Sequence, residues 1–102
     1  MEQQQQLLNQ IAQLLHSHCD KNYDEANLKY EFLPDGSWQS FSAWFTKDGK
    51  NHIPYDFSEL KEKAEKLCET LYLSMKEEND WRKITFKIDK ERKAIVNYSY
   101  NE

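Results

Sequence analysis

Apolar residues recur along this chain with two different periods, and the changes between them mark the secondary structure. Near the N-terminus the spacing of three to four residues places apolar side chains on one face and predicts a helix over residues 3–18. That face carries Leu7, Leu8, Ile11, Leu14 and Leu15. The same spacing returns later and predicts a second helix from residue 57 to about residue 78. Its stripe is Leu60, Ala64, Leu67, Leu71 and Met75, flanked by Cys68 and Tyr72.

The start of the second helix carries a capping pattern. Asp56 followed by Glu59 fits a capping box, with Asp56 as N-cap and Ser58 as a rival cap. Tyr55 and Leu60 are spaced for a hydrophobic staple across the same turn. The pairs Glu59–Lys63 and Glu62–Lys66 are spaced for ion pairs along the exposed side.

Between and after the helices the period changes to two, which predicts strands. The alternating segments are 28–32, 38–46, 84–88 and 94–100, with a short strand at 51–53. Pro34-Asp35-Gly36, Asp48-Gly49 and the polar run from Asp89 to Arg92 predict the turns.

The resulting order is α-β-β-(β)-α-β-β in a single domain spanning residues 1–102. Strands joined by tight turns are antiparallel, and two amphipathic helices need an apolar surface to cover. We therefore expect an α+β two-layer sandwich, with both helices on one face of a four- to five-stranded antiparallel sheet. The open face would carry Trp38 and Trp44, together with Lys29, Glu31, Lys83, Thr85 and Lys87.

Composition narrows the functional classes. The 102 residues carry a formal charge of −4, which argues against general binding of nucleic acid through its phosphates and is compatible with a basic partner. No apolar run is long enough for a membrane span, and no basic segment opens the chain, so we expect no membrane contact and no signal peptide. A cytoplasmic location follows, in which Cys19 and Cys68 are free structural thiols.

Catalytic and metal-binding patterns are weak in this sequence. His16, His18 and Cys19 lie close together, but no second cluster supplies the four ligands of a structural zinc site. Neither a nucleophile elbow nor a glycine-rich phosphate loop is present. We therefore expect a protein that is not an enzyme and that uses neither metal nor cofactor.

Aromatic and acidic residues are the candidates for binding a partner. Trp38 and Trp44 on one exposed face could stack on bases, anchor a protein interface, or simply pack half-buried. A local basic patch of Lys83, Lys87 and Lys93 is compatible with the first alternative. Acids in predicted loops or at the chain end would steer a basic protein. The candidate set is Asp24, Glu25, Asp35, Trp38, Trp44, Asp48, Asp80, Trp81, Tyr98 and Tyr100.

The last third of the chain carries the most specific pattern. A long amphipathic helix (60–75) is followed by Trp81, the strand Lys83-Ile84-Thr85-Phe86-Lys87-Ile88, and a second strand ending in Asn97-Tyr98-Ser99-Tyr100. This layout resembles the YezG-like immunity proteins, which neutralise polymorphic toxins in bacteria. The resemblance extends from the first helix to the C-terminus, and it assigns no functional residue by position.

The resemblance implies a cytosolic inhibitor that occludes a cognate toxin, often a nuclease used in contact-dependent inhibition. The alternative from the residues alone is a small binding or adaptor module, with single-stranded nucleic acid as one ligand of its aromatic face. We expect a monomer, although an exposed edge strand at 51–53 or at the C-terminus is able to pair with another chain.

Overall fold

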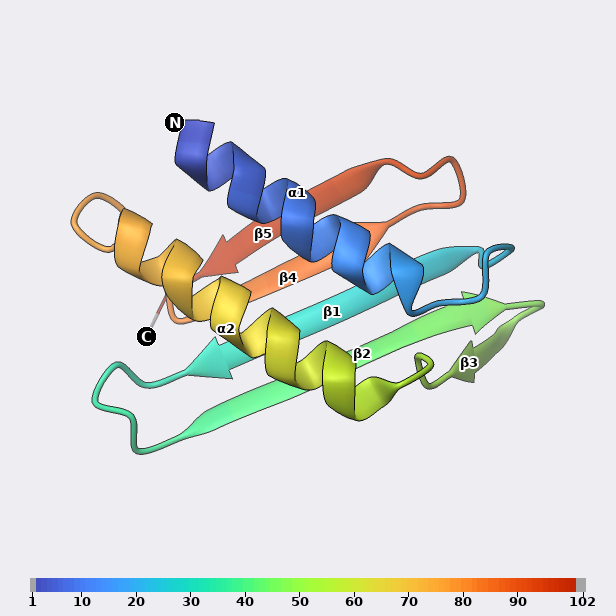
Figure 1. Ribbon diagram of the computed structural model, residues 1–102, viewed down its shortest axis with the longest axis horizontal. Helices are drawn as coiled ribbons and strands as arrows, with labels where there is room; N and C mark the ends of the chain where they lie inside the picture. Colours follow the sequence, from blue (N-terminus) through green and yellow to red (C-terminus); the bar gives the residue numbers. More distant parts are fainter. Residues whose placement is uncertain (1, 101–102) are drawn as a thin grey trace.

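The computed structural model describes residues 2–100 and contains two helices and a five-stranded sheet (Figure 1). The elements, in chain order, are α1 (Glu2–Ser17), β1 (Glu25–Phe32), β2 (Gln39–Lys47), β3 (Lys50–His52), α2 (Phe57–Met75), β4 (Lys83–Ile88) and β5 (Ala94–Ser99). This confirms the predicted α+β class and element order, and the short third strand joins the sheet.

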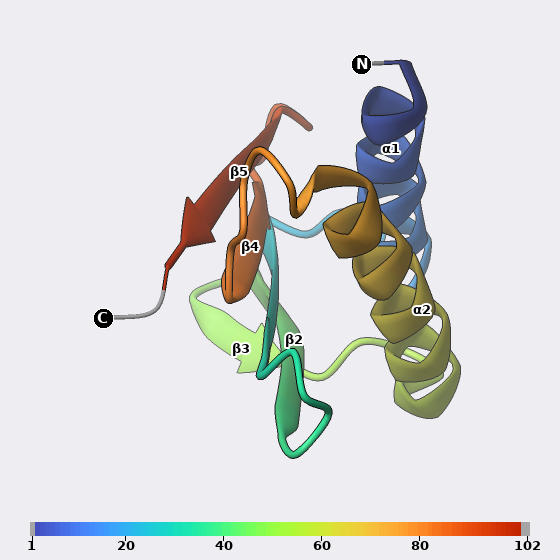
Figure 2. The same ribbon diagram turned by 90° about the vertical axis from the view of Figure 1, so that its left-hand side faces the viewer.

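The sheet is antiparallel throughout, with the strand order β3-β2-β1-β4-β5. β1 is the central strand. On one side it pairs with β2 through the first hairpin, and on the other side it pairs with β4, which follows α2 in the chain. Both helices lie on the same side of the sheet, as the view along the layers shows (Figure 2). The arrangement is therefore the predicted two-layer sandwich, with one sheet face left open.

The core lies between the helices and the sheet, where the two apolar periods meet. Ile11 and Leu15 of α1 and Leu60 and Leu71 of α2 are fully buried, as the stripe positions predicted. The strands contribute alternate residues to the same core, namely Ala26, Leu28, Tyr30, Ala43, Phe45, Ile84, Phe86 and Ile88. Because side chains alternate along a strand, the residues between them face the open side.

The capping box predicted for α2 is wrong, although Asp56 does occupy the N-cap position. Asp56 has left-handed backbone angles (φ 51°, ψ 51°), and its side chain makes no capping hydrogen bond. Glu59 is bound to His18, so its carboxylate is engaged with a residue 41 positions earlier. The start of α2 is thus held by a tertiary contact in place of a local one.

Two boundaries and one ion pair also differ from the predictions. α2 ends at Met75, and the amides of Glu78 and Asn79 both donate to the Met75 carbonyl oxygen in a closing turn. β1 starts at Glu25, so Glu25 lies in a strand and not in a loop. Along α2 the ion pairs are Glu59–Lys63, as predicted, and Lys61–Glu65 (3.1 Å), whereas the spacing had indicated Glu62–Lys66.

Both cysteines are free and buried, as predicted. Burial raises the pKa of each thiol to about 12, so both remain protonated near neutral pH. Neither described helix combines the length and the apolar character needed to cross a bilayer.

Candidate functional site: a groove between the second helix and the first hairpin

Two adjoining hollows form a groove between α2 and the β1–β2 hairpin. The first has a volume of about 410 Å³ and the second about 360 Å³, and both include Tyr30, Gln39 and Glu69. We call them the polar hollow and the aromatic hollow, and together the helix–hairpin groove. The remaining residues of the polar hollow are Ser58, Lys61, Glu62, Glu65 and Lys66. Those of the aromatic hollow are Phe32, Leu33, Pro34, Gly36, Trp38, Tyr72 and Leu73.

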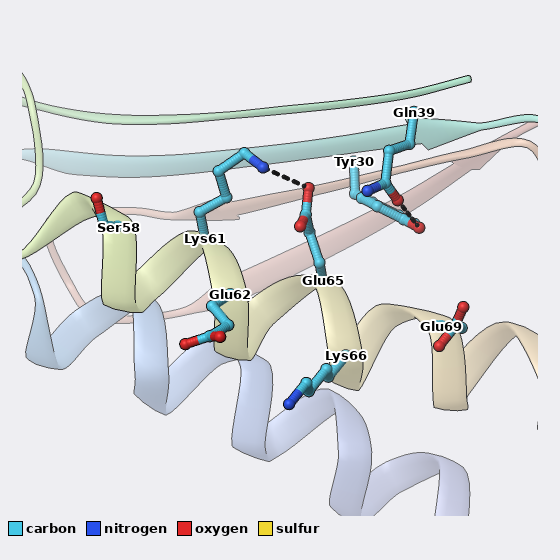
Figure 3. Close-up of a pocket in the computed structure, with 8 residues that line it drawn as sticks. All are labelled: Tyr30, Gln39, Ser58, Lys61, Glu62, Glu65, Lys66 and Glu69. Carbon is cyan, nitrogen blue, oxygen red and sulfur yellow. Dashed lines mark hydrogen bonds and ion pairs between the residues drawn. The ribbon is translucent and has the colours of Figure 1, made fainter. Parts of the chain in front are cut away.

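The polar hollow is organised by two internal contacts (Figure 3). Lys61 and Glu65 point from α2 toward the sheet and form an ion pair of 3.1 Å. The Tyr30 hydroxyl donates to the Gln39 side-chain oxygen at 3.1 Å. Glu62 and Lys66 point away from this pair, toward the side of α1. These two contacts engage four of the eight side chains that line the polar hollow.

The aromatic hollow is different, because large apolar side chains there remain in contact with solvent. Leu33 is 40% exposed, Trp38 48% and Leu73 57%. Behind them Phe32 packs edge-on against Tyr72, with ring centroids 4.7 Å apart, and also against Trp81. Exposed apolar residues backed by a rigid aromatic layer are typical of protein-binding hot spots.

Charge around the groove is mixed, with an acidic excess. Glu62, Glu65 and Glu69 outnumber Lys61 and Lys66 among its lining residues. Asp35 lies at the tip of the adjoining turn, where it accepts the Ser37 amide hydrogen (2.8 Å). Hydrogen bonding by the Ser37 side chain, together with this bond from the Ser37 amide, stabilises the ionised carboxylate and lowers the pKa of Asp35.

The residues that line the groove do not include an activated nucleophile. Burial raises the pKa of Tyr30 to about 12, so its hydroxyl is a neutral hydrogen-bond donor near neutral pH and not a base. Ser58 is the groove's only hydroxyl besides the tyrosines, and the groove holds no histidine or cysteine that could activate it. The arrangement is suited to binding.

The structure separates the two tryptophans that the sequence placed on one face. Trp44 lies on β2 with its side chain half-buried on the open face. Trp38 precedes β2 and lines the aromatic hollow with Tyr72 and Leu73 of α2, on the helix side. The prediction that they share a face is wrong, because strand alternation does not extend into the turn. The expected pair of exposed tryptophans is therefore not present.

Trp81 and Tyr98 lie in or against the core and not on the surface. Trp81 is completely buried, and its ring packs against Phe32, Tyr72 and Tyr98. Tyr98 of β5 is half-buried over the same cluster. Trp81 was a candidate for partner binding, but in this fold no partner reaches it without unfolding.

Asp80 and Tyr100 lie near the same end of the sheet and are held by internal contacts. Asp80 accepts hydrogen bonds from Tyr72 and Arg82, and the Arg82 guanidinium is the main cause of its lowered pKa. The Tyr100 hydroxyl donates to Asn79, while its side chain is 54% exposed. These residues border the aromatic end without lining the hollow.

The remaining acidic candidates lie at the opposite end of the sheet. Asp24 accepts the Asp48 amide hydrogen (3.1 Å) beside the β2–β3 turn. Glu25 pairs with Lys87 on the open face at 3.2 Å. The ten candidate residues thus do not form one site: Trp38 lines the groove, Asp35 lies at the adjoining turn, and the others border the groove, lie in the core or lie elsewhere.

Of the residues that line the groove, the sequence-based candidates included only Trp38, and Tyr72 and Leu73 are two that were missed. Leu73 was detectable, because it is an apolar residue two positions away from Leu71 and therefore off the stripe of α2. Together with Leu33 and Trp38 it belongs to a cluster of exposed apolar side chains, and such a cluster indicates a contact surface where a single exposed leucine does not.

The histidines near the end of α1 hold separate contacts. His18 is buried, with Nδ1 donating to the Leu14 carbonyl oxygen (2.9 Å) and Nε2 3.1 Å from Glu59 Oε1. His16 Nδ1 lies 2.9 Å from the Tyr23 hydroxyl oxygen. Among residues 2–100 no group of three His, Cys, Asp or Glu side chains is placed to hold a metal ion.

No protein-family model matches the chain, and no curated protein sequence matches it significantly.

Proposed function

We propose that this chain is a non-catalytic immunity protein that acts in the cytoplasm by binding and occluding a cognate bacterial toxin. The observation that carries the proposal is the aromatic hollow, where Leu33, Trp38 and Leu73 are exposed around a packed aromatic layer. Tryptophan is enriched among the few side chains that supply most of the free energy of protein–protein binding, and surrounding apolar contacts exclude water from them. The layout of the last third of the chain resembles that of YezG-like immunity proteins and supports a bacterial toxin as the class of partner.

The partner is expected to be basic, as many nuclease toxins are. The chain has a formal charge of −4, and the groove has an excess of carboxylates beside its apolar end. Such charges accelerate the encounter with a basic protein, while the apolar residues hold the complex once it has formed. Occlusion requires no reaction, and the internal Lys61–Glu65 and Tyr30–Gln39 contacts are in keeping with a binding role.

A nucleic-acid ligand has weaker support. The stacking surface of that alternative needed two exposed tryptophans on one face, and Trp38 and Trp44 lie on different faces. One of the three open-face lysines of β1 and β4, Lys87, is already paired with Glu25.

The test is binding and neutralisation of the toxin domain encoded next to this chain. An equimolar mixture should abolish toxin activity, and Trp38→Ala or Leu73→Ala should weaken binding by about tenfold or more. Ile53→Ala is the matched control, because Ile53 is 73% exposed and follows β3, away from the aromatic hollow. Full toxin activity in the presence of excess wild-type protein would exclude the proposed function. An equal loss of affinity in the Ile53→Ala variant would place the interface elsewhere.

A further inference from the structure

β5 is an edge strand that lacks the usual protection against pairing with another strand. Its six residues, Ala94-Ile95-Val96-Asn97-Tyr98-Ser99, contain no charge, no proline and no glycine. Natural edge strands are normally protected by lysine, proline, a bulge or a covering helix. The larger helix–strand contacts are to β1, β2 and β4, while Ala94 at the start of β5 lines a hollow together with Ala12 and Gln13 of α1. The rest of β5 runs along the edge of the sheet (Figure 2).

The register shows which backbone groups of β5 are free. The Asp89 amide donates to the Lys93 carbonyl oxygen (3.0 Å), and the pairs that follow run from Ile88–Ala94 to Lys83–Ser99. Hydrogen-bonded pairs alternate with non-bonded pairs in an antiparallel ladder. The amides and carbonyls of Ile95, Asn97 and Ser99 therefore face β4. Those of Ala94, Val96 and Tyr98 point outward at the edge.

The strand is also complementary to itself. In a two-fold antiparallel pair centred on Asn97, the outward backbone amide and carbonyl of Val96 would bond to those of Tyr98 in the second copy. Those of Tyr98 would likewise bond to Val96 of the second copy. That register gives two β-branched–aromatic contacts on the helix side, which is a favourable cross-strand combination. On the open face Asn97 would lie opposite Asn97, and Ile95, now 50% exposed, opposite Ser99. The strand carries no charge that would repel its own copy.

From these observations we infer that β5 is a self-association edge, through which two copies of this chain form a symmetric dimer with one continuous ten-stranded sheet. A two-fold axis perpendicular to the sheet keeps both helical layers on the same side, because paired residues then have the same inward or outward direction. This inference is independent of the toxin-binding proposal, since the helix–hairpin groove lies at β1, β2 and α2.

The test is the mass of the purified chain in solution as its concentration is raised, measured by sedimentation equilibrium. We expect a shift from 12.3 kDa toward twice that value. Amide hydrogen exchange provides the second readout. The Val96 and Tyr98 amides should become protected only as the dimer forms, whereas those of Ile95 and Asn97 should be protected at every concentration.

Two matched variants locate the interface. Asn97→Lys places equal charges opposite each other in the pair, and should raise the dimer dissociation constant by about tenfold. Asn51→Lys makes the same change on the other edge strand, β3, and should leave the dissociation constant unchanged. Both residues are exposed, so both variants should retain the wild-type circular dichroism spectrum.

Three results would overturn the inference. The first is a monomeric mass up to the solubility limit, even if a strand from a different protein then binds β5. The second is a dimer that Asn51→Lys disrupts and Asn97→Lys does not. The third is a dimer in which the Val96 and Tyr98 amides exchange as fast as in the monomer.

Discussion

Arg92 combines a strained backbone with an anchoring side chain, and two substitutions separate the two effects. Its φ is +70°, in the left-handed region, at the third loop position of the β4–β5 hairpin where glycine is favoured. Its guanidinium donates to the carbonyl oxygens of Tyr23 (3.0 Å) and Lys21 (2.8 Å) and lies 3.9 Å from the Tyr23 ring centroid. The side chain thereby ties the last hairpin to the segment after α1.

The two effects have opposite signs. The part-buried bond to Tyr23 and the exposed bond to Lys21 contribute about 0.5–1 kcal/mol each, and the cation–π contact a similar amount. Arg92→Ala should therefore lower the free energy of unfolding by about 2 kcal/mol. Alanine keeps the cost of a side chain at positive φ, about 1 kcal/mol, whereas glycine does not. Arg92→Gly should therefore lower the free energy of unfolding by only about 1 kcal/mol.

Thermal and urea unfolding of the three proteins measures this difference. For a domain of this size, about 4 °C of melting temperature corresponds to 1 kcal/mol, so we expect losses of about 8 °C for Arg92→Ala and 4 °C for Arg92→Gly. Lys93→Ala, at the neighbouring exposed position, is the control and should change stability by less than about 0.5 kcal/mol. Equal stability of the alanine and glycine variants would refute the strain argument. Wild-type stability in both would refute the anchoring role.

Three further predictions concern the core, the titrating groups and the thiols. Leu71 is fully buried, so Leu71→Ala should lower the free energy of unfolding by about 2–5 kcal/mol. Leu73 is 57% exposed, so Leu73→Ala should lower it by less than about 0.5 kcal/mol. Similar losses in the two variants would contradict the assigned core. Arg82 lowers the pKa of Asp80 below its ordinary value of 3.8. The ionised Asp80 carboxylate therefore stabilises the folded state above pH 3.8, and this contribution to the free energy of unfolding is lost as the pH falls through the lowered pKa. Urea unfolding across this range should show a shallower acid loss for Asp80→Asn than for wild type, and identical curves would contradict it. Cys19 and Cys68, each with a thiol pKa of about 12, should react with a thiol reagent only on unfolding; rapid labelling of the native chain would contradict their burial.

The sequence predicted the elements because periodicity reports which side of an element is buried. The stripes of both helices and the inward positions of β1, β2 and β4 all follow from spacing alone. The predictions failed where a contact with a residue far away in the sequence determines the local structure. Glu59 pairs with His18, which is 41 positions away, so a capping rule based on the adjacent turn does not apply.

The candidate site was less predictable for a similar reason. A solvent-exposed aromatic and a buried one look alike in a sequence, and residue type alone does not separate Trp38 from Trp81. Trp81 is buried because Phe32, Tyr72 and Tyr98 surround it, and these come from three different elements. The groove likewise needs α2 to lie beside the first hairpin, which no local pattern specifies.

The central position of β1 affects how the chain is made. β1 pairs with β2 through a short turn, but its other partner, β4, lies about sixty residues further along. Because synthesis proceeds from the N-terminus, a ribosome-bound chain ending at α2 has both helices and the first hairpin while the second edge of β1 is still unpaired. Ala26, Leu28 and Tyr30 are then next to open backbone groups. Completion of the last twenty residues therefore closes the sheet, and until then the nascent chain is most exposed to wrong strand pairing.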